Sequence, residues 1–195
     1  MKIIIAIAGK SGSGKDTIAK ALCKRYPVIH NIISCTTRPP RDYEKNGVDY
    51  HFITDKEFYK AADNGEMLEI SEFNHWNYGT RESDIFDGIN VGVFNPEGLD
   101  SLADCESKSS DIKIYNYYLH CDDKIRMLRL LNREENPDVK EIIRRWKTDD
   151  QDFALIEWCR NWATSDWANI KWLENSNKED MDAVIQQIAQ DLGLS

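Results

Sequence analysis

A glycine-rich loop directly after an apolar strand is the feature that most constrains how this chain folds. The run Ile3-Ile4-Ile5-Ala6-Ile7-Ala8 leads at once into Gly9-Lys10-Ser11-Gly12-Ser13-Gly14-Lys15-Asp16-Thr17. Ile18, Ala21 and Leu22 then follow at helical spacing. Glycines adopt positive φ and lack a Cβ, so successive N–H groups of such a loop can point into one concavity that holds a polyphosphate. We interpret Gly9–Thr17 as a P-loop, with a Gly/Ser-rich surface turn as the alternative.

Three residues of this loop bear on phosphate and metal chemistry. Lys15 supplies a positive charge toward the outer phosphates. The next position of a P-loop usually carries a Ser or Thr whose hydroxyl binds Mg²⁺. Here that position is Asp16, and the hydroxyl comes one residue later at Thr17. We therefore expect Asp16 and Thr17 at a Mg²⁺ site that differs in detail from the usual one.

The composition predicts one compact domain. The chain has 195 residues, of which 41% are hydrophobic, and its formal net charge is -9. This length is sufficient for one well-buried core with small insertions. The negative charge argues against a wholly basic surface that binds polymeric nucleic acid, whereas a local basic pocket is compatible with it. The oligomeric state is left open.

The cysteines and the N-terminal run predict a cytoplasmic protein that does not bind membranes. Five scattered cysteines form no CxxC pair: Cys23, Cys35, Cys105, Cys121 and Cys159. The number is odd and no segment resembles a signal peptide, which is typical of reduced thiols. The apolar run at the N-terminus is too short to span a bilayer.

Strand-like and helix-like segments alternate along the chain. Strands are expected at 2–8, 28–34, 89–95, 112–120 and 168–173. The alternation predicts an α/β fold with a parallel sheet covered by helices on both faces. The segment 35–85 is rich in aromatic, Gly and charged residues and does not resemble a crossover helix, so we interpret it as an inserted subdomain.

Three further helices are expected in the second half of the chain. The first carries a basic stripe of Arg126, Arg129 and Arg133. That stripe is either functional or a solvated face. The second helix is expected to have Asn136 as its N-cap and Pro137 at its first position. The last spans about 178–192 and stops before Gly193.

Two arginines stand three residues apart in the segment Ser34-Cys35-Thr36-Thr37-Arg38-Pro39-Pro40-Arg41. The Pro-Pro step resists helix formation, so the segment is expected to be extended and rigid. Two fixed guanidinium groups can bind a phosphate bidentately. A salt-bridged surface loop is the alternative.

Further motifs follow this segment in order: Glu44, Gly47-Val48-Asp49-Tyr50-His51-Phe52, Gly65-Glu66-Met67-Leu68-Glu69 and Tyr78-Gly79-Thr80. Together with the P-loop they closely resemble the guanylate kinase family, over most of the chain and most densely in residues 1–80. The resemblance implies a single P-loop kinase domain over 1–195, with a parallel sheet core flanked by helices. That core would comprise 1–34, 86–121 and 148–195, with an inserted β-rich nucleoside-monophosphate-binding subdomain at 35–85 and a helical lid at 122–147.

The resemblance also implies the substrates and the residues that hold them. ATP with Mg²⁺ would bind at the P-loop, and GMP or dGMP in the inserted subdomain. The acceptor phosphate would be held by Arg38, Arg41, Tyr50 and Tyr78. The guanine base would be held by Ser34, Glu69 and Thr80, with Gly79 in the same motif. The alternative for each of the two tyrosines is a strand core residue, and without the resemblance Glu69 would be interpreted as an exposed strand carboxylate.

The resemblance assigns arginines of the lid to the transfer step. Arg133 lies where the family's lid carries an arginine, and Arg144 or Arg145 lies where a helical lid-edge arginine sits. The Arg-Trp order favours Arg145. Together with Lys15 and Arg38, these arginines are expected to position the moving phosphoryl group and spread its charge.

One departure from the family is clear. The third expected strand ends in Val93-Phe94-Asn95, where the family has an Asp-x-Asp ending near the acceptor and the metal. Both carboxylates are absent, which puts rate, base preference and metal handling in question. We expect Asp16 to offset part of this loss by returning a carboxylate to the Mg²⁺ shell.

The sequence therefore predicts an enzyme that transfers the γ-phosphoryl group of ATP to GMP or dGMP in line. Two alternatives remain. The altered strand ending and Asp16 are compatible with a kinase for another nucleoside monophosphate. A non-catalytic, guanylate-kinase-like protein-binding module is the second alternative, and the complete P-loop argues against it.

Overall fold

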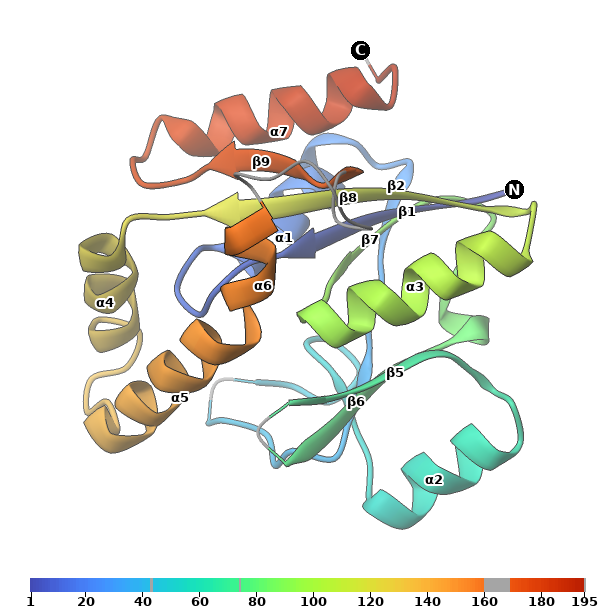
Figure 1. Ribbon diagram of the computed structural model, residues 1–195, viewed down its shortest axis with the longest axis horizontal. Helices are drawn as coiled ribbons and strands as arrows, with labels where there is room; N and C mark the ends of the chain where they lie inside the picture. The colour runs from blue at the N-terminus through green and yellow to red at the C-terminus, as the bar shows by residue number, and fades with distance from the viewer. Residues whose placement is uncertain (43, 74, 160–168, 195) are drawn as a thin grey trace. The chain divides into compact units, whose positions relative to one another are not determined.

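The computed structural model of this chain describes residues 1–42, 44–73, 75–159 and 169–194. These residues form two units, and Figure 1 labels their helices and strands. The first unit comprises Met1–Ala6 and Pro27–Tyr115, and the second comprises Ile7–Tyr26 and Asn116–Ser195. The strands β1 (Lys2–Ala8) and β8 (Ile112–His120) each contain residues of both units.

The first unit contains the elements between the P-loop helix and β8. In chain order they are β2 (Ile29–Asn31), β3 (Cys35–Thr36), β4 (His51–Phe52), α2 (Asp55–Asp63), β5 (Met67–Phe73), β6 (Trp76–Arg81), a 3₁₀ turn (Glu82–Asp84), β7 (Gly88–Val93) and α3 (Pro96–Lys108). Thr54 begins α2 as part of a capping box with Glu57, in which each side chain accepts from the other residue's backbone N–H. Helix α3 runs along β5, where Ser101 and Cys105 donate to backbone carbonyls of the strand.

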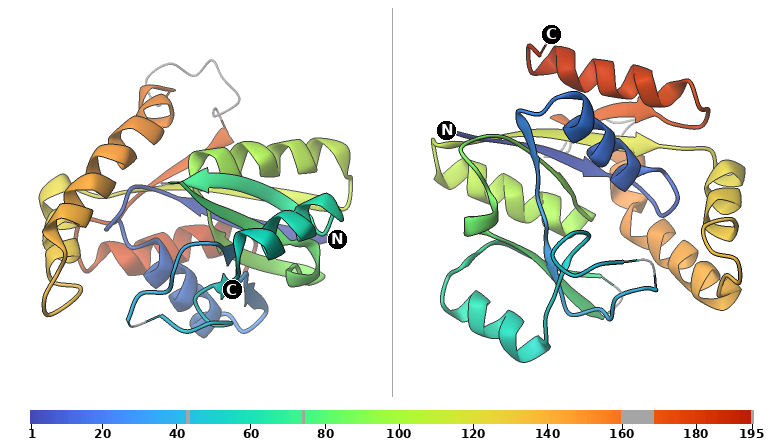
Figure 2. Two further views of the ribbon diagram at one scale, coloured as in Figure 1. Left: turned by 90° about the horizontal axis from the view of Figure 1, so that it is seen from below. Right: turned by 180° about the vertical axis from the view of Figure 1, so that it is seen from behind.

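The second unit contains the P-loop and the helices after β8. Its elements are α1 (Lys15–Arg25), α4 (Asp123–Leu131), α5 (Val139–Asp152), α6 (Ala154–Cys159), β9 (Lys171–Glu174) and α7 (Asp180–Asp191). Helix α7 packs against α1 and β9, which Figure 2 shows from behind. Its buried positions Val184, Ile185, Ile188 and Ala189 recur at helical spacing and explain this contact.

The strands form two sheets. The five-stranded sheet has the order β2-β7-β1-β8-β9, and the four-stranded sheet has the order β4-β3-β6-β5. In the first, β2 pairs with β7 and β8 pairs with β9 in parallel. In the second, β6 is antiparallel to β3 and β5, while β3 and β4 are parallel. This is the expected α/β architecture, with a parallel core flanked by helices and a separate mixed sheet.

The core begins with β1. Ile4, Ile5 and Ile7 are at most 1% exposed. A strand buried on both faces requires such a continuous apolar run, because helices cover both sides of a parallel sheet. The prediction of a buried strand that leads into the glycine-rich loop is confirmed.

Several expected boundaries differ from the structure. Strand β2 covers only Ile29–Asn31 of the expected 28–34, and β9 begins at Lys171 rather than at 168, a residue outside the described ranges. Helix α4 ends at Leu131, so Arg133 lies beyond the helix that was expected to carry it. The expected Asn136 cap is wrong. Asp138 is the N-cap of α5, since its side chain accepts from the N–H groups of the second and third helical residues.

Two findings concern the cysteine thiols and the lengths of the helices. Of the cysteines whose side chains are described, Cys23, Cys35, Cys105 and Cys121 are free. Within the described part of the chain, no helix is long and apolar enough to cross a membrane.

The position of the α5 cap can be tested by two single substitutions. Asp138→Ala removes the acceptor of the N–H groups of Lys140 and Glu141, at 3.0 and 3.1 Å. We expect it to lower the free energy of unfolding by about 1 kcal/mol. Asn136→Ala should change the free energy of unfolding by less than about 0.5 kcal/mol. Urea unfolding of both variants checks this, and a larger loss for Asn136→Ala would contradict the assignment.

Candidate functional site

The P-loop lies in the second unit between β1 and α1. Gly12 and Gly14 have φ values of 81° and 101°, which L side chains rarely adopt. A Cβ on Gly12 would lie 2.7 Å from the Arg126 backbone oxygen, and one on Gly14 would lie 2.5 Å from Asn175 Nδ2. Both positions therefore require glycine, for backbone conformation and for the close approach of α4 and of the residue after β9.

Lys15 folds back over the loop. Its Nζ donates to the carbonyl oxygens of Gly9 at 2.6 Å and Lys10 at 3.2 Å. Burial lowers the pKa of the Lys15 ammonium to about 8; Arg145 and Arg133 add to this effect, whereas Asp16 and Asp149 oppose it. The Lys15 ammonium contacts two backbone carbonyls and would be stabilised by an anion beside it, which a phosphate would supply.

The helices after β8 bring three arginines to the P-loop. Arg126 is 1% exposed and its Nε donates to the Ser11 carbonyl at 3.0 Å. Arg129 donates to the Ser13 carbonyl at 3.2 Å. Arg145 donates to the Ser11 hydroxyl at 3.2 Å. The solvated-face interpretation of the basic stripe is therefore wrong for Arg126.

The structure distinguishes the two candidate lid-edge arginines by their contacts. Arg144 pairs with Glu141 one turn earlier on the same helix and is half exposed. Arg145 faces the loop through Ser11 and adds to the positive charge around Lys15. Arg133 is exposed and contributes to the same charge from the segment after α4.

The candidate metal residues lie in the first turn of α1. Asp16 and Thr17 are both exposed there. Among the described residues, no group of three or more His, Cys, Asp and Glu side chains is arranged to hold a metal ion. Mg²⁺ in nucleotide sites is typically held by one or two carboxylates together with the substrate phosphates. A single carboxylate at Asp16 fits that pattern.

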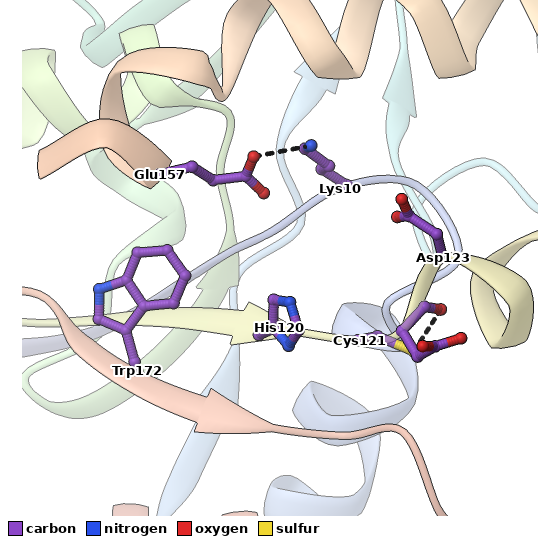
Figure 3. A pocket seen from close by; sticks show the side chains of 7 residues that line it. Lys10, His120, Cys121, Asp123, Glu157 and Trp172 are labelled. Atoms are coloured by element: carbon purple, nitrogen blue, oxygen red, sulfur yellow. Dashed lines mark hydrogen bonds and ion pairs between the residues drawn. The ribbon is translucent and has the colours of Figure 1, made fainter. Parts of the chain in front are cut away.

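A pocket of about 460 Å³ adjoins the P-loop in the second unit (Figure 3). It is lined by Lys10, His120, Cys121, Asp122, Asp123, Glu157 and Trp172. Lys10 forms ion pairs with Glu157 and with Asp150, each at 2.9 Å. The side chain of Lys10 is thus held by α5 and α6, while Lys15 is the lysine that turns into the loop.

The two arginines after β3 form a cluster around Glu44 in the first unit. Arg38 donates through both terminal nitrogens to the two Glu44 oxygens at 2.9 Å. Arg41 adds its backbone N–H at 2.8 Å and its Nη1 at 3.0 Å. Burial opposes ionisation, but Glu44, with Tyr78 nearby, raises the pKa of Arg38 above the usual arginine value. The segment is held in place by a buried carboxylate.

Both predicted tyrosines lie beside this cluster. The Arg38 guanidinium carbon lies 5.5 Å from the centre of the Tyr50 ring. The Tyr50 and Tyr78 rings meet edge to face with their centres 6.0 Å apart. Both residues are half-buried, so neither is a core residue of the small sheet. The structure therefore gathers Arg38, Arg41, Tyr50 and Tyr78 in one place.

The predicted base-binding residues form a second cluster in the same unit. Thr80 Oγ1 donates to Glu69 Oε1 at 2.8 Å, and the Ser34 and Thr80 hydroxyl oxygens are 3.2 Å apart. Glu69 and Thr80 are paired across β5 and β6. Glu69 is 4% exposed, so the interpretation as an exposed carboxylate is wrong. The neighbouring Gly79 leaves room for the backbone of β5, since a Cβ there would lie 2.9 Å from the Glu69 carbonyl.

The pKa of the Glu69 carboxyl group is raised well above its usual value. Burial raises the pKa of its carboxyl group to about 7, and the Glu97 carboxylate adds to the shift, whereas the Thr80 hydroxyl opposes it. A buried carboxylate with one donor retains capacity for further hydrogen bonds. This group therefore lies where a ligand with paired N–H donors would stabilise its charge.

Asn95 keeps part of the role of the carboxylate that the sequence lacks. Its side chain is the N-cap of α3 and accepts from the Gly98 N–H at 2.8 Å. Asn and Asp cap helices about equally well, so the fold does not require a charge here. Val93 ends β7 without a polar group. Neither Val93 nor Asn95 carries a negative charge, whereas Glu97 in the first turn of α3 is near enough to Glu69 to raise its pKa.

Two functional features were missed by the sequence prediction. Glu44 was noted as part of a motif, but its pairing with both arginines was not expected. Asp149 was not singled out at all, although it is 1% exposed and accepts from the Ser11 N–H at 2.6 Å. Its spacing was the signal that could have revealed it: Asp149 follows Ile142 by seven positions and Trp146 by three, so an acidic residue falls on the apolar side of the helix.

Comparisons with known proteins identify the family that this chain resembles. A family model described as Guanylate kinase matches residues 1–92. The guanylate kinase of Malacoplasma penetrans is 34% identical over 164 residues, which cover 78% of this chain and 84% of that protein. The guanylate kinase of Thermotoga maritima is 43% identical over 89 residues, covering 46% of this chain and 43% of that protein. The crystal structure of guanylate kinase from Anaplasma phagocytophilum shares the fold, with a TM-score of 0.66 at 18% identity over 98% of this chain and 84% of that chain.

The shifted titration of Glu69 predicts a pH-dependent stability. Because its folded pKa is raised from 4.5 to about 7, its favourable contribution is complete below pH 4.5 and is lost as the pH rises to 7. Glu69→Gln removes this loss, so we expect it to be more stable than the wild type at pH 8 by up to about 3 kcal/mol, with little difference at pH 4.5.

Urea unfolding at the two pH values measures this difference. Glu66→Gln, which removes an exposed carboxylate just before the same strand, is the matched control and should show no such dependence. An equal effect of Glu69→Gln at pH 4.5 and pH 8 would contradict the shifted titration.

Proposed function

The chain belongs to the guanylate kinase family of nucleoside monophosphate kinases, and we propose that it transfers the γ-phosphoryl group of ATP to GMP or dGMP. The observation that carries this proposal lies in the first unit. An arginine pair suited to a phosphate monoester and a buried carboxylate with two hydroxyls suited to a guanine edge occur in one small sheet subdomain. This combination specifies a purine nucleoside monophosphate as acceptor.

Two buried polar atoms support phosphate binding in the two clusters. Within the described ranges, Arg38 Nε and Ser13 Oγ are buried and have no hydrogen-bond partner. Buried polar groups are nearly always paired, so an unpaired one at a candidate site favours a ligand there. Arg38 belongs to the proposed acceptor site and Ser13 to the P-loop. Each proposed phosphate position thus contains one group that a phosphate oxygen would satisfy.

Base selection would come from Glu69, Ser34 and Thr80. An ionised Glu69 accepts the N1–H and N2–H₂ donors of guanine, and a hydroxyl donates to O6. Adenine offers no such donor pair, and the buried carboxylate would be left unsatisfied. Discrimination of as much as about 10⁴-fold is available from such a site. The pyrimidine bases also lack an adjacent ring N–H and amino group of this kind.

Acceptor binding at Arg38 and Arg41 requires a change of partners at Glu44. The carboxylate now occupies the arginine nitrogens that would meet the phosphate dianion. Phosphate binding would either displace Glu44 or share the donors with it. Glu44 therefore keeps the arginines ordered and charge-balanced until the acceptor arrives.

The donor side would use Lys15, Arg145 and Arg133. Their charges already act on one another, since both arginines lower the pKa of Lys15. A bound triphosphate would reverse that unfavourable interaction, because its charge attracts all three. Phosphoryl transfer consists mainly of positioning and charge stabilisation, so no covalent nucleophile is required. These cations would close on the moving group and exclude water.

Mg²⁺ is the second component that the family implies. The residues present fit it: one carboxylate, Asp16, and one hydroxyl, Thr17, are exposed in the first turn of α1 beside the P-loop. When bound, Mg²⁺ supplies charge neutralisation between the outer phosphates. With Val93 and Asn95 in place of carboxylates, Asp16 is the proposed protein ligand, directly or through water.

The remaining sequence predictions belong to the same proposal. These are a cytoplasmic location, a nucleoside-monophosphate-binding subdomain at 35–85 and a lid at 122–147. The first range falls within the first unit and the second within the second unit. The alternatives, a kinase for another base and a non-catalytic binding module, are not favoured by the relatives found.

Acceptor turnover is the direct test of the function. We expect ADP release from Mg·ATP with GMP and dGMP, and rates at least about 10³-fold lower with AMP, dTMP, dCMP and UMP. A coupled assay with each acceptor measures this. Arg38→Met removes the guanidinium that is proposed to bind the acceptor phosphate, so this variant is the background control. Turnover with a monophosphate of another base would contradict the proposed guanine site. Turnover with none of the acceptors would contradict the proposed kinase activity.

The role of Asp16 has its own test. If Asp16 is the carboxylate of the Mg²⁺ shell, Asp16→Ala should raise the Mg²⁺ concentration for half-maximal rate by about tenfold or more, since a charged ligand is lost. The KM for GMP should stay within about twofold because the acceptor site is intact. Titration of Mg²⁺ at fixed ATP measures both. An unchanged Mg²⁺ dependence would refute the assignment, and Asp182→Ala, an exposed first-turn acid of α7, is the control.

A further inference from the structure

Both main-chain polar groups of Ser11 are held by buried side chains from the helices after β8. Arg126 Nε donates to the Ser11 carbonyl at 3.0 Å. The Ser11 N–H donates to Asp149 Oδ2 at 2.6 Å, and its hydroxyl oxygen lies 3.2 Å from Asp149 Oδ1. The arginine and the carboxylate also pair with each other at 3.3 Å. One residue of the P-loop is thus fixed on two sides by one ion pair.

Burying the Arg126–Asp149 ion pair carries a large desolvation penalty. Arg126 and Asp149 are each 1% exposed, so both ions are fully desolvated. Arg126 also lies 4.1 Å over the Trp146 ring and pairs with Asp123. Replacing a buried ion pair by well-packed neutral groups is often neutral or stabilising. Stability alone therefore does not account for two buried charges at this position.

The pair instead controls the direction of loop peptides. In a trans peptide the C=O and the following N–H point in opposite directions. Arg126 holds the Ser11 carbonyl on the α4 side, so the Gly12 N–H is turned to the opposite side. Arg129 and Asn175 hold the Ser13 carbonyl at 3.2 and 2.7 Å, which turns the Gly14 N–H in the same way.

The packing at Gly12 reinforces this constraint. A Cβ there would lie 2.7 Å from the Arg126 carbonyl oxygen and 3.2 Å from its Cα. The backbone of α4 therefore lies directly against the loop at the residue after Ser11. Neither the side chain nor the main chain of Arg126 can shift without moving Gly12.

We propose that Arg126 and Asp149 are positioning residues that set the P-loop main chain for polyphosphate binding, without contacting the nucleotide themselves. Arg126 fixes the carbonyl direction, and Asp149 fixes the preceding N–H and balances the arginine charge. The inference rests on the proposed function in taking ATP as the polyphosphate. It concerns residues outside the motifs that resemble the family.

Three variants separate positioning from stability. Asp149→Asn leaves the buried Arg126 guanidinium with the exposed Asp123 as its carboxylate partner and should lower both the melting temperature and ATP affinity. The double variant Arg126→Met/Asp149→Asn has no buried charge, and its amide oxygen can still accept from Ser11. We expect the double variant to recover the melting temperature to within about 3 °C, while its Kd for ATP stays at least about tenfold above the wild-type value. Glu141→Gln, an exposed carboxylate on the same helix paired with Arg144, is the matched control for both readouts.

ATP binding by calorimetry without acceptor, together with the KM for GMP, gives the required readouts. A raised Kd for ATP at an unchanged KM for GMP supports positioning. Recovery of ATP affinity together with the melting temperature in the double variant would show a merely structural pair and overturn the proposal. So would wild-type affinity in a folded Asp149→Asn. Wild-type protein that binds ATP but phosphorylates no monophosphate would instead reject the proposed function and leave this comparison valid.

Discussion

The arrangement of the second unit depends on the hydrogen bonds that the main chain of one short glycine-rich loop requires. The loop between β1 and α1 can present N–H groups to an anion only if its carbonyl groups find donors elsewhere. Arg126, Arg129 and Asn175 provide those donors from outside the loop. Lys15 takes the Gly9 and Lys10 carbonyls from within. The conformation of the glycine-rich loop therefore depends on side chains that are more than a hundred residues away in the sequence.

Pairing of site residues with side chains from outside the anion site also occurs in the first unit, where a carboxylate holds two arginines. An empty phosphate site made of arginines would be a concentration of unpaired cations, and Glu44 prevents this by pairing with both Arg38 and Arg41. In the second unit, Asp149 and Asp150 pair with Arg126 and Lys10. Each cationic site thus carries an internal carboxylate that balances its charge. The cost is that phosphate must compete with that carboxylate, which lowers affinity and favours release of a charged product.

The sequence predicted features that depend on local pattern and missed those that depend on long-range pairing. The strand 2–8, the loop and the strand 112–120 follow from apolar runs and glycine spacing, and the structure has β1 and β8 over these same residues. The cap of α5 was predicted two residues early because Asn136-Pro137 matches the usual N-terminal pattern, whereas Asp138 provides the acceptor. Asp149 could not be identified as functional because its meaning depends on Arg126 and Ser11, which periodicity alone does not bring together. Roles of individual site residues came from resemblance, and the geometry adds which of them share a cluster.

The missing strand carboxylates change how the base site must work. Asn95 preserves the cap of α3, so the loss of charge there does not disturb the helix that lies next to Glu69. With Val93 also uncharged, the proposed recognition of a guanine edge would depend on Glu69, and burial raises the pKa of this carboxyl group to about 7. A ligand that donates two hydrogen bonds stabilises the ionised form and therefore lowers that pKa on binding. A protonated carboxyl group could instead donate to a ring nitrogen and accept from an amino group, so the preference for guanine would require the ionised form. Base selection in the proposed site would therefore be coupled to ionisation of Glu69, because the carboxylate form accepts the paired donors of guanine and adenine lacks them.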